Sequence, residues 1–150
     1  DVRRHRRSRT HPRIEVEVRL VYIAGPYRAA TPWGVQQNIN NAAALSAKVH
    51  AAGMFAVCPH LNSAHMEGVA DDEHFLTGTM TLMRVCHAVI LTRDWRNSAG
   101  ALAEVAEATR LGIPVFGRAQ TEHNDGGALD GLIAGSAETL DAGTGRTSCA

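Results

Sequence analysis

The sequence predicts a single α/β domain, an open parallel sheet with helices on both faces. Three observations support this prediction. Short apolar runs suited to buried strands alternate with longer stretches of helical composition. Polar loops containing glycine or proline separate the two kinds of segment. A chain of 150 residues suits one domain rather than two. The expected order is β-α-β-α-β-α-β, which implies parallel strands with right-handed crossovers, as in flavodoxin- or Rossmann-like sheets.

The first half of the pattern is a strand, a helix and a second strand. Residues 19–24 are rich in β-forming side chains, and Gly25 and Pro26 end the run. After a loop that reaches residue 32, apolar or small side chains at helical spacing predict a helix over residues 35–52. Residues 54–58 form the second expected strand, and a loop is expected beyond it.

The second half repeats the pattern with two more helices and strands. An acidic start at residues 71–73 suits the beginning of a helix that extends to residue 84. Residues 88–92 form the third expected strand. A polar loop over residues 97–100 then precedes a helix over residues 101–111, whose composition strongly favours helix. Residues 113–116 form the fourth expected strand.

The two ends of the chain differ in composition from the domain, which we expect to cover residues 19–135. Residues 1–18 form a basic leader that we expect to be disordered, and residues 136–150 a flexible tail after a short helix near residues 128–134. The leader contains six arginines: Arg3, Arg4, Arg6, Arg7, Arg9 and Arg13. Such an arm could bind nucleic acid, but the remaining chain is acidic, which argues against that partner.

The cysteine pattern and the lack of long apolar segments favour a cytoplasmic protein. Cys58, Cys86 and Cys149 are odd in number and widely spaced, which argues against a disulfide scaffold and favours a reducing compartment. No apolar run is long enough to cross a membrane or to form the core of a signal peptide. His60 and His65 follow Cys58 without a recognised zinc spacing, so no metal is expected. The dinucleotide and P-loop glycine motifs are also missing, and we expect no cofactor.

Candidate site residues follow three of the expected strands. Because the carboxyl ends of parallel strands lie along one edge of a sheet, these residues should converge there. The set comprises Tyr27, Arg28, His60, Asn62, His65, Asp94, Ser98 and Glu104. A helix beginning near Ser98 would stabilise an anion, for example a phosphorylated small molecule. The alternatives are a helix-capping role alone for Ser98 and an ordinary surface position for Glu104.

Several of these residues form motifs that resemble the nucleoside 2-deoxyribosyltransferase-like superfamily. Residues 21–27, VYIAGPY, resemble the start of its first strand, and Ser98-x-Gly100-x-x-x-Glu104 resembles its catalytic stretch. Residues 59–61 and 86–88 resemble a branch described as a domain of unknown function, often found in phages and actinobacteria. That branch usually has Asp where this chain has His87. The resemblance spans residues 20–116.

The resemblance implies an enzyme that acts on a nucleoside or nucleotide. Glu104 would attack the anomeric carbon of the sugar, expel the base and form a glycosyl-enzyme intermediate. Tyr22 would orient the Glu104 carboxylate, and Asp94 could assist proton transfer to the leaving base. The expected substrate-binding residues are Gly25, Tyr27, Arg28, His60, Asn62, Ser98 and Gly100.

Ser98 decides which reaction the resemblance favours. Nucleoside transferases of the superfamily carry Asp at this position, whereas related nucleoside 5′-monophosphate N-glycosidases carry Ser as part of a phosphate site. The sequence therefore favours an N-glycosidase that hydrolyses a (deoxy)nucleoside 5′-monophosphate. The alternatives are a 2-deoxyribosyltransferase that exchanges bases and a non-catalytic nucleotide-binding module. The resemblance also implies a homodimer or higher homo-oligomer, in which Trp33 and Trp95 could form an interface or a base-stacking wall. Ordinary local packing is the alternative for both tryptophans.

Overall fold

The computed structural model describes residues 18–120 and 127–143. The basic arginines of the leader and residues 144–150 lie outside these ranges, so the expectations for them stay predictions. Within the described ranges, no helix is long and apolar enough to cross a membrane.

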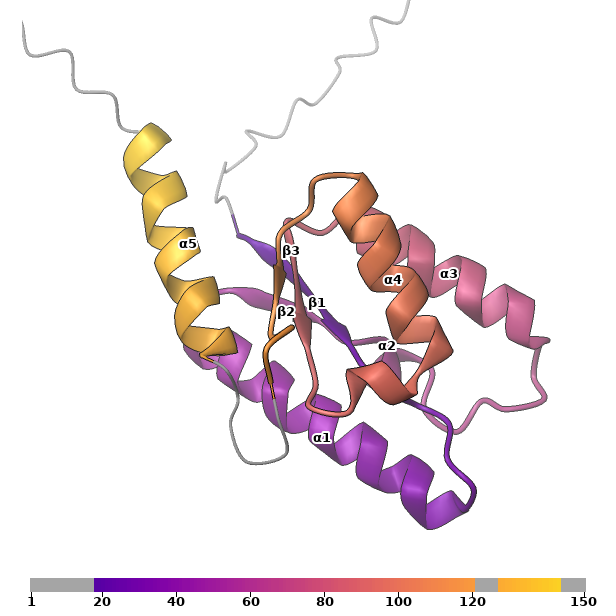
Figure 1. The fold of residues 1–150 in the computed structure, drawn as a ribbon. Helices are drawn as coiled ribbons and strands as arrows, with labels where there is room; N and C mark the ends of the chain where they lie inside the picture. Colours follow the sequence, from indigo (N-terminus) through magenta and orange to yellow (C-terminus); the bar gives the residue numbers. More distant parts are fainter. Residues whose placement is uncertain (1–17, 121–126, 144–150) are drawn as a thin grey trace, which may run out of the picture.

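The centre of the molecule is a four-stranded, fully parallel sheet in the order β2-β1-β3-β4 (Figure 1). Its strands are β1 (Leu20–Ala24), β2 (Phe55–Val57), β3 (Ala88–Leu91) and β4 (Val115–Phe116). The two central strands are almost completely buried, as their uninterrupted apolar sequences predict. The α/β fold class and the alternation of strands and helices are therefore confirmed.

Helices cover both faces of this sheet. They are α1 (Pro32–Ala51), α2 (Pro59–Asn62), α3 (Asp72–Arg84), the 3₁₀ helix η1 (Trp95–Asn97), α4 (Ala99–Arg110) and α5 (Ala128–Gly143). Helices α1 and α5 lie against one face, and α3 and α4 lie against the other (Figure 1).

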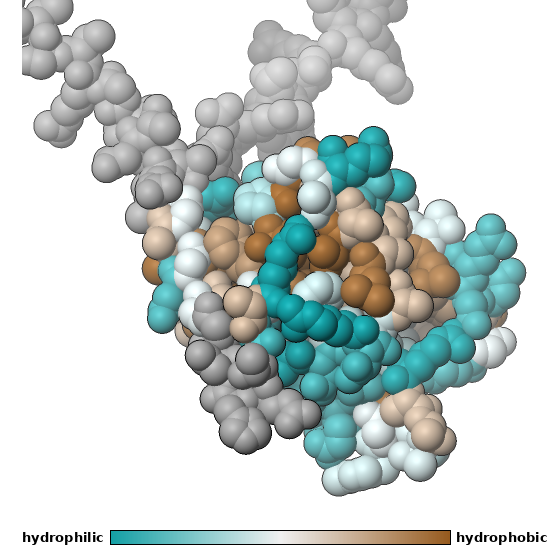
Figure 2. Space-filling view, viewed as in Figure 1, coloured by the Kyte–Doolittle hydropathy of each residue, from teal (hydrophilic) through white to brown (hydrophobic). Residues whose placement is uncertain are grey.

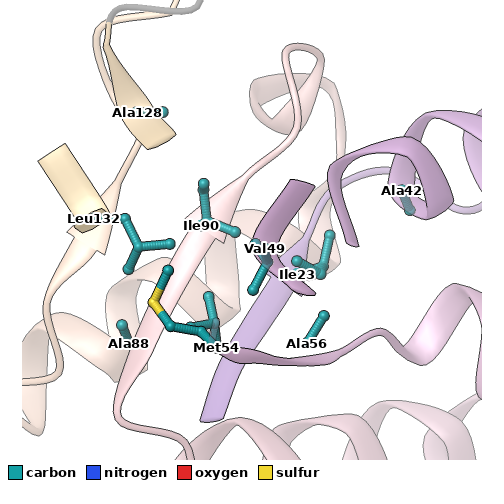
Figure 3. Packing of buried hydrophobic residues seen from close by; sticks show 10 residues of the cluster. Ile23, Ala42, Val49, Met54, Ala56, Ala88, Ile90, Ala128 and Leu132 are labelled. Carbon is teal, nitrogen blue, oxygen red and sulfur yellow. The ribbon is translucent and has the colours of Figure 1, made fainter. Parts of the chain in front are cut away.

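Successive side chains of β1 point to opposite faces and so belong to two separate clusters of buried residues. Val21 and Ile23 pack with α1 and α5, as Figure 3 shows for Ile23 among the surrounding apolar side chains. Tyr22 and Ala24 face the other side, where they pack with α3 and α4. This alternation places Tyr22, the middle residue of β1, between the sheet and α4.

Local hydrogen bonds explain two helix boundaries that differ from the sequence prediction. Helix α1 begins at Pro32 rather than at residue 35, because Thr31 caps it by accepting a hydrogen bond from the Gly34 N–H at 3.0 Å. The segment after β2 was expected to be a loop, but it forms the single turn of α2, with proline at its first position. Short turns of this kind leave little periodic signal in a sequence.

Helix α5 is longer than the sequence predicted. The expected short helix over residues 128–134 continues to Gly143, so the expected boundary of the flexible tail near residue 135 lies inside this helix. Ala128 and Leu132 are buried against the sheet, which explains why the helix is anchored at its start.

The surface above α3 and α4 is partly apolar. Figure 2 shows apolar side chains gathered on this side of the molecule and surrounded by hydrophilic ones. Leu76 on α3 is 56% exposed and Leu102 on α4 is 45% exposed. Such a surface is compatible with the expected homo-oligomer, which stays a prediction.

Candidate active site

A cavity of about 770 Å³ opens at the carboxyl end of β1. The loop after β1, the segment from α2 to α3, and the first turns of α4 form its walls. Eight of the eleven expected site residues line it: Tyr22, Gly25, Tyr27, Arg28, His60, Ser98, Gly100 and Glu104. The convergence of loops from separate strands therefore occurs as the parallel sheet predicts.

Glu104 lies on the side of α4 that faces the sheet. It belongs to a buried stripe with Ala101, Val105 and Ala108, at the spacing of one helical face. The Tyr22 hydroxyl donates a hydrogen bond to Glu104 Oε1 at 2.7 Å. Glu104 is only 9% exposed, so it is not an ordinary surface charge.

Burial dominates the electrostatics of this pair. It raises the pKa of Glu104 to about 7, although hydrogen bonds to Tyr22 and Thr79 act in the opposite direction. Burial, followed by the charge of Glu104, raises the pKa of Tyr22 far above its usual range. Tyr22 therefore remains a hydrogen-bond donor at any physiological pH, while Glu104 changes its charge near neutrality.

Thr79 is a residue of this site that the sequence reasoning missed. It lies on α3, lines the cavity and is half-buried. Thr77 and Thr81 stand two residues away on either side, and no local pattern distinguishes the three threonines. Only the packing of α3 against α4 shows that Thr79 is the one next to Glu104.

Two carboxylates at the cavity rim were also missed, and both contact expected site residues. The Tyr27 hydroxyl donates a hydrogen bond to Glu67 and accepts one from the His65 N–H at 3.0 Å. Arg28 forms an ion pair with Asp72, and both side chains are largely exposed. The loop after β1 is thus joined to the segment between α2 and α3 by two contacts that involve carboxylates.

His60 is a buried histidine that contacts the loop after β1. Its Nε2 lies 2.9 Å from the Pro26 carbonyl oxygen, which can only accept, so Nε2 carries the hydrogen. Burial lowers the pKa of His60, which keeps the ring neutral at pH 7. Its Nδ1 has no hydrogen-bond partner among the described residues.

Ser98 and Gly25 have structural roles that the geometry makes visible, whereas Gly100 has none of this kind. Ser98 caps α4 by accepting a hydrogen bond from the Ala101 N–H at 3.1 Å, and it also lines the cavity. A Cβ on Gly25 would lie 2.0 Å from Thr92 Oγ1, so close packing against the end of β3 requires glycine there. At Gly100 a Cβ would meet its nearest neighbours at 3.7 Å, which is ordinary contact.

Three expected site residues, Asn62, His65 and Asp94, and both tryptophans do not line the cavity. Asp94 is exposed at the start of η1, and Asn62 is exposed at the end of α2. Trp95 is buried in the cluster beneath α4, so it is not a base-stacking wall, and Trp33 is exposed on the first turn of α1.

His87 binds the start of β1 through both its side chain and its backbone. Its Nδ1 accepts a hydrogen bond from the Leu20 N–H at 2.9 Å, and its own N–H donates to the Leu20 carbonyl oxygen at 2.9 Å. The departure from the usual residue of the resembled branch therefore preserves an acceptor at the start of β1.

No cation site is visible near this cavity. Within residues 18–120 and 127–143, no group of three or more His, Cys, Asp or Glu side chains is arranged to hold a metal ion.

The fold and the site together define a class of α/β protein that holds a buried carboxylate at the carboxyl edge of its parallel sheet. Residues 19–118 match the family described as "Domain of unknown function (DUF7768)", and the chain belongs to that family. No curated protein matches the chain.

Three solved structures with a similar fold are two deoxyribosyltransferases and one conserved protein. A 2-deoxyribosyltransferase from Bacillus psychrosaccharolyticus has a TM-score of 0.50 and 14% identity, over 64% of this chain and 69% of that chain. A conserved protein from Enterococcus faecalis V583 has a TM-score of 0.54 and 18% identity, over 87% of this chain and 77% of that chain. A 2-desoxiribosyltransferase from Leishmania mexicana is similar at a TM-score of 0.45 and 19% identity, over 65% and 62%. The two structures with TM-scores of 0.50 and 0.54 show that this chain has a deoxyribosyltransferase-like α/β fold.

Proposed function

We propose that the protein is a glycosyl-transferring enzyme that cleaves the N-glycosidic bond of a nucleoside, with Glu104 as its nucleophile. The observation that carries the proposal is the buried Tyr22–Glu104 pair in a cavity at the carboxyl edge of the sheet. The Glu104 carboxylate attacks the anomeric carbon while the bond to the base breaks, and the base leaves with the bonding electrons. A second base, or water, then attacks the same carbon and releases Glu104.

The environment of Glu104 suits this chemistry. A buried carboxylate interacts strongly with the positive charge that develops on the sugar, because few water molecules screen it. The hydrogen bond from the Tyr22 hydroxyl fixes Oε1 of the carboxylate. Since only the ionised form can attack, and the pKa is about 7, activity is expected to rise from acidic to neutral pH.

Base exchange between nucleosides is the reaction that we favour. One structure with a similar fold is a 2-deoxyribosyltransferase. The cavity rim also carries the carboxylates of Glu67 and Asp72, and Asp72 already pairs with Arg28. Such a rim repels a phosphate dianion, which favours an uncharged nucleoside over the monophosphate that the sequence favoured.

Hydrolysis of a nucleoside 5′-monophosphate is the second candidate. Ser98 and Arg28 line the same cavity, and Ser98 begins α4, whose first N–H groups favour an anion. Arg28 is exposed, so a phosphate could displace Asp72 from it. A non-catalytic nucleotide-binding module would use the same cavity without turnover.

Release of free base from a panel of substrates separates these candidates. Nucleosides and their 5′-monophosphates are incubated with the protein, with and without a second free base, and the products are separated by chromatography. Exchange on nucleosides, lost in Glu104→Ala, supports the transferase. Release from monophosphates alone, also lost in Glu104→Ala, supports the hydrolase. Turnover that persists in Glu104→Ala would rule out the proposed nucleophile, and binding without turnover would favour the non-catalytic module.

A further inference from the structure

Thr79 occupies a fixed position beside the Tyr22–Glu104 pair. Helix α3 packs against α4, and Leu76, three residues before Thr79, lies 3.7 Å from where a Cβ on Gly100 would be. This packing directs the Leu76–Thr79 side of α3 toward the first turns of α4. Thr79 lines the cavity together with Tyr22 and Glu104, and its hydroxyl lies near enough to both groups to lower their pKa values.

The Thr79 hydroxyl has two acceptors for its single hydrogen. In the structure it donates to the Leu76 carbonyl oxygen at 3.2 Å. The Glu104 carboxylate, which lines the same cavity and whose pKa Thr79 lowers, is the second acceptor to which the hydroxyl can turn. When Glu104 is ionised, donation to the carboxylate is the stronger hydrogen bond. When Glu104 is protonated, the Thr79 oxygen can accept from it and donate to Leu76.

We propose that Thr79 is a positioning residue whose hydroxyl, with that of Tyr22, holds the ionised Glu104 carboxylate and turns to the Leu76 carbonyl when Glu104 is protonated. The proposal rests on the proposed function only in taking Glu104 as the reacting group. Two hydroxyls then stabilise the charged form of Glu104 and leave its negative charge in place. An arginine would neutralise that charge.

The charged and titratable groups around Glu104 leave this task to hydroxyls. Tyr22 faces it from β1, and Cys86, beyond the end of α3, lies near Tyr22. The other titratable groups lining the cavity are Tyr27, Arg28, His60, Glu67 and Asp72. Arg28 is paired with Asp72, and no described cation forms an ion pair with Glu104. Removing one of its two hydroxyl partners should therefore have a measurable effect on the charged form.

The test is an NMR titration of Glu104 in the full chain. The protein is labelled with ¹³C at the glutamate side-chain carboxyls, and the Glu104 signal is identified by its loss in Glu104→Gln. Thr79→Val keeps the shape of the side chain but removes the hydroxyl, so we expect the pKa of Glu104 to rise above its wild-type value. Thr79→Ser restores the hydroxyl and is expected to return the pKa toward that of the wild type.

Thr81→Val is the matched control on the same helix. It also removes a threonine hydroxyl that donates to a helix carbonyl, here that of Thr77 at 2.8 Å, but at an exposed position. Its titration of Glu104 should match the wild type. Thr79→Ala, which favours helix, replaces Thr79→Val if that variant does not fold.

The titration tests the role of Thr79, and the kinetics test the proposed activity, so the two proposals can be contradicted separately. Where base release is measurable, the acidic limb of kcat/KM should move to higher pH in Thr79→Val, with a loss of roughly three- to tenfold on that limb and little change at high pH. An unchanged pKa of Glu104 in both Thr79→Val and Thr79→Ala would overturn the proposal. A raised pKa without base release from any protein would uphold the role of Thr79 and overturn the proposed activity.

Discussion

Two glutamates on α4, Glu104 and Glu107, lie less than one helical turn apart, yet their surroundings shift their pKa values in opposite directions. Burial raises the pKa of Glu104 to about 7, and its hydrogen-bond partners are hydroxyls. Hydrogen bonds from Arg110 and then Arg84 lower the pKa of Glu107 to about 2. The Arg110 and Arg84 Nε atoms lie 2.8 and 3.0 Å from its oxygens.

The difference shows that partners, rather than residue type or helix position, decide what a carboxylate can do. Glu107 is fully ionised at neutral pH, but its charge is already used by two guanidinium groups. Glu104 keeps its charge available because Tyr22 donates a hydrogen bond without carrying a positive charge. A nucleophile in a water-poor cavity requires the second arrangement.

The largest expected effect concerns activity. Glu104→Gln retains the shape and the Tyr22 hydrogen bond but removes the charge, and base release should fall by roughly 10³-fold or more. Glu107→Gln makes the same chemical change three residues away, and base release should stay within about twofold of the wild type. Initial rates on the best substrate of the panel measure both. Similar losses in the two variants would contradict the distinction.

The next effect concerns stability and its dependence on pH. The pKa of Glu104 rises from 4.5 to about 7 on folding, so between these values the folded state binds more protons than the unfolded state. The stability of the wild type therefore falls as pH rises through this window, by up to about 3 kcal/mol. Glu104→Gln lacks this loss. Its free energy of unfolding relative to the wild type should increase from pH 5 to pH 8 in urea titrations.

A flat difference between Glu104→Gln and the wild type across this range would contradict the raised pKa. Glu107→Gln serves as the control for a change of charge on α4, because the linkage at Glu107 has the opposite sign.

The smallest effect is expected at Glu107. Its pKa is lowered on folding, so its ionised form stabilises the protein above the unfolded pKa of about 4.5, and this contribution is lost as pH falls toward 2. Because its arginine partners are largely exposed, Glu107→Gln should lower the thermal midpoint at pH 7 only slightly, and less at high salt. Thermal unfolding in low and high salt measures this. A large, salt-independent loss would mean that the ion pairs matter more than their exposure suggests.

Several features of the site could be predicted because they are encoded locally. The apolar runs of β1 and β3 predicted buried central strands, and Ser98 predicted the start of α4. The spacing from Ser98 to Glu104 then placed the carboxylate near the carboxyl edge of the sheet. The resemblance of these motifs to a known superfamily pointed to the same pair, Tyr22 and Glu104. These features can be predicted because a strand, a helix cap and a helical spacing each depend on a few consecutive residues.

Other features of the site depend on contacts between distant segments. The pairing of Arg28 with Asp72 and of Tyr27 with Glu67 joins two loops, and neither loop carries a periodic pattern. The position of Asp94 also depends on tertiary structure. Its place in the sequence after β3 suggested a site residue, but it lies at the start of η1, outside the cavity.

The sequence by itself determined the order of strands and helices, the parallel sheet and the edge at which the candidate site lies. These follow from hydrophobic periodicity and from the chain geometry of parallel strands. Only the tertiary structure decided which hydroxyls lie beside Glu104 and which glutamate of α4 forms ion pairs with arginine. The physical reason is that the ionisation of a carboxylate depends on solvent exposure and on partners a few ångströms away, and packing, rather than sequence separation, sets both.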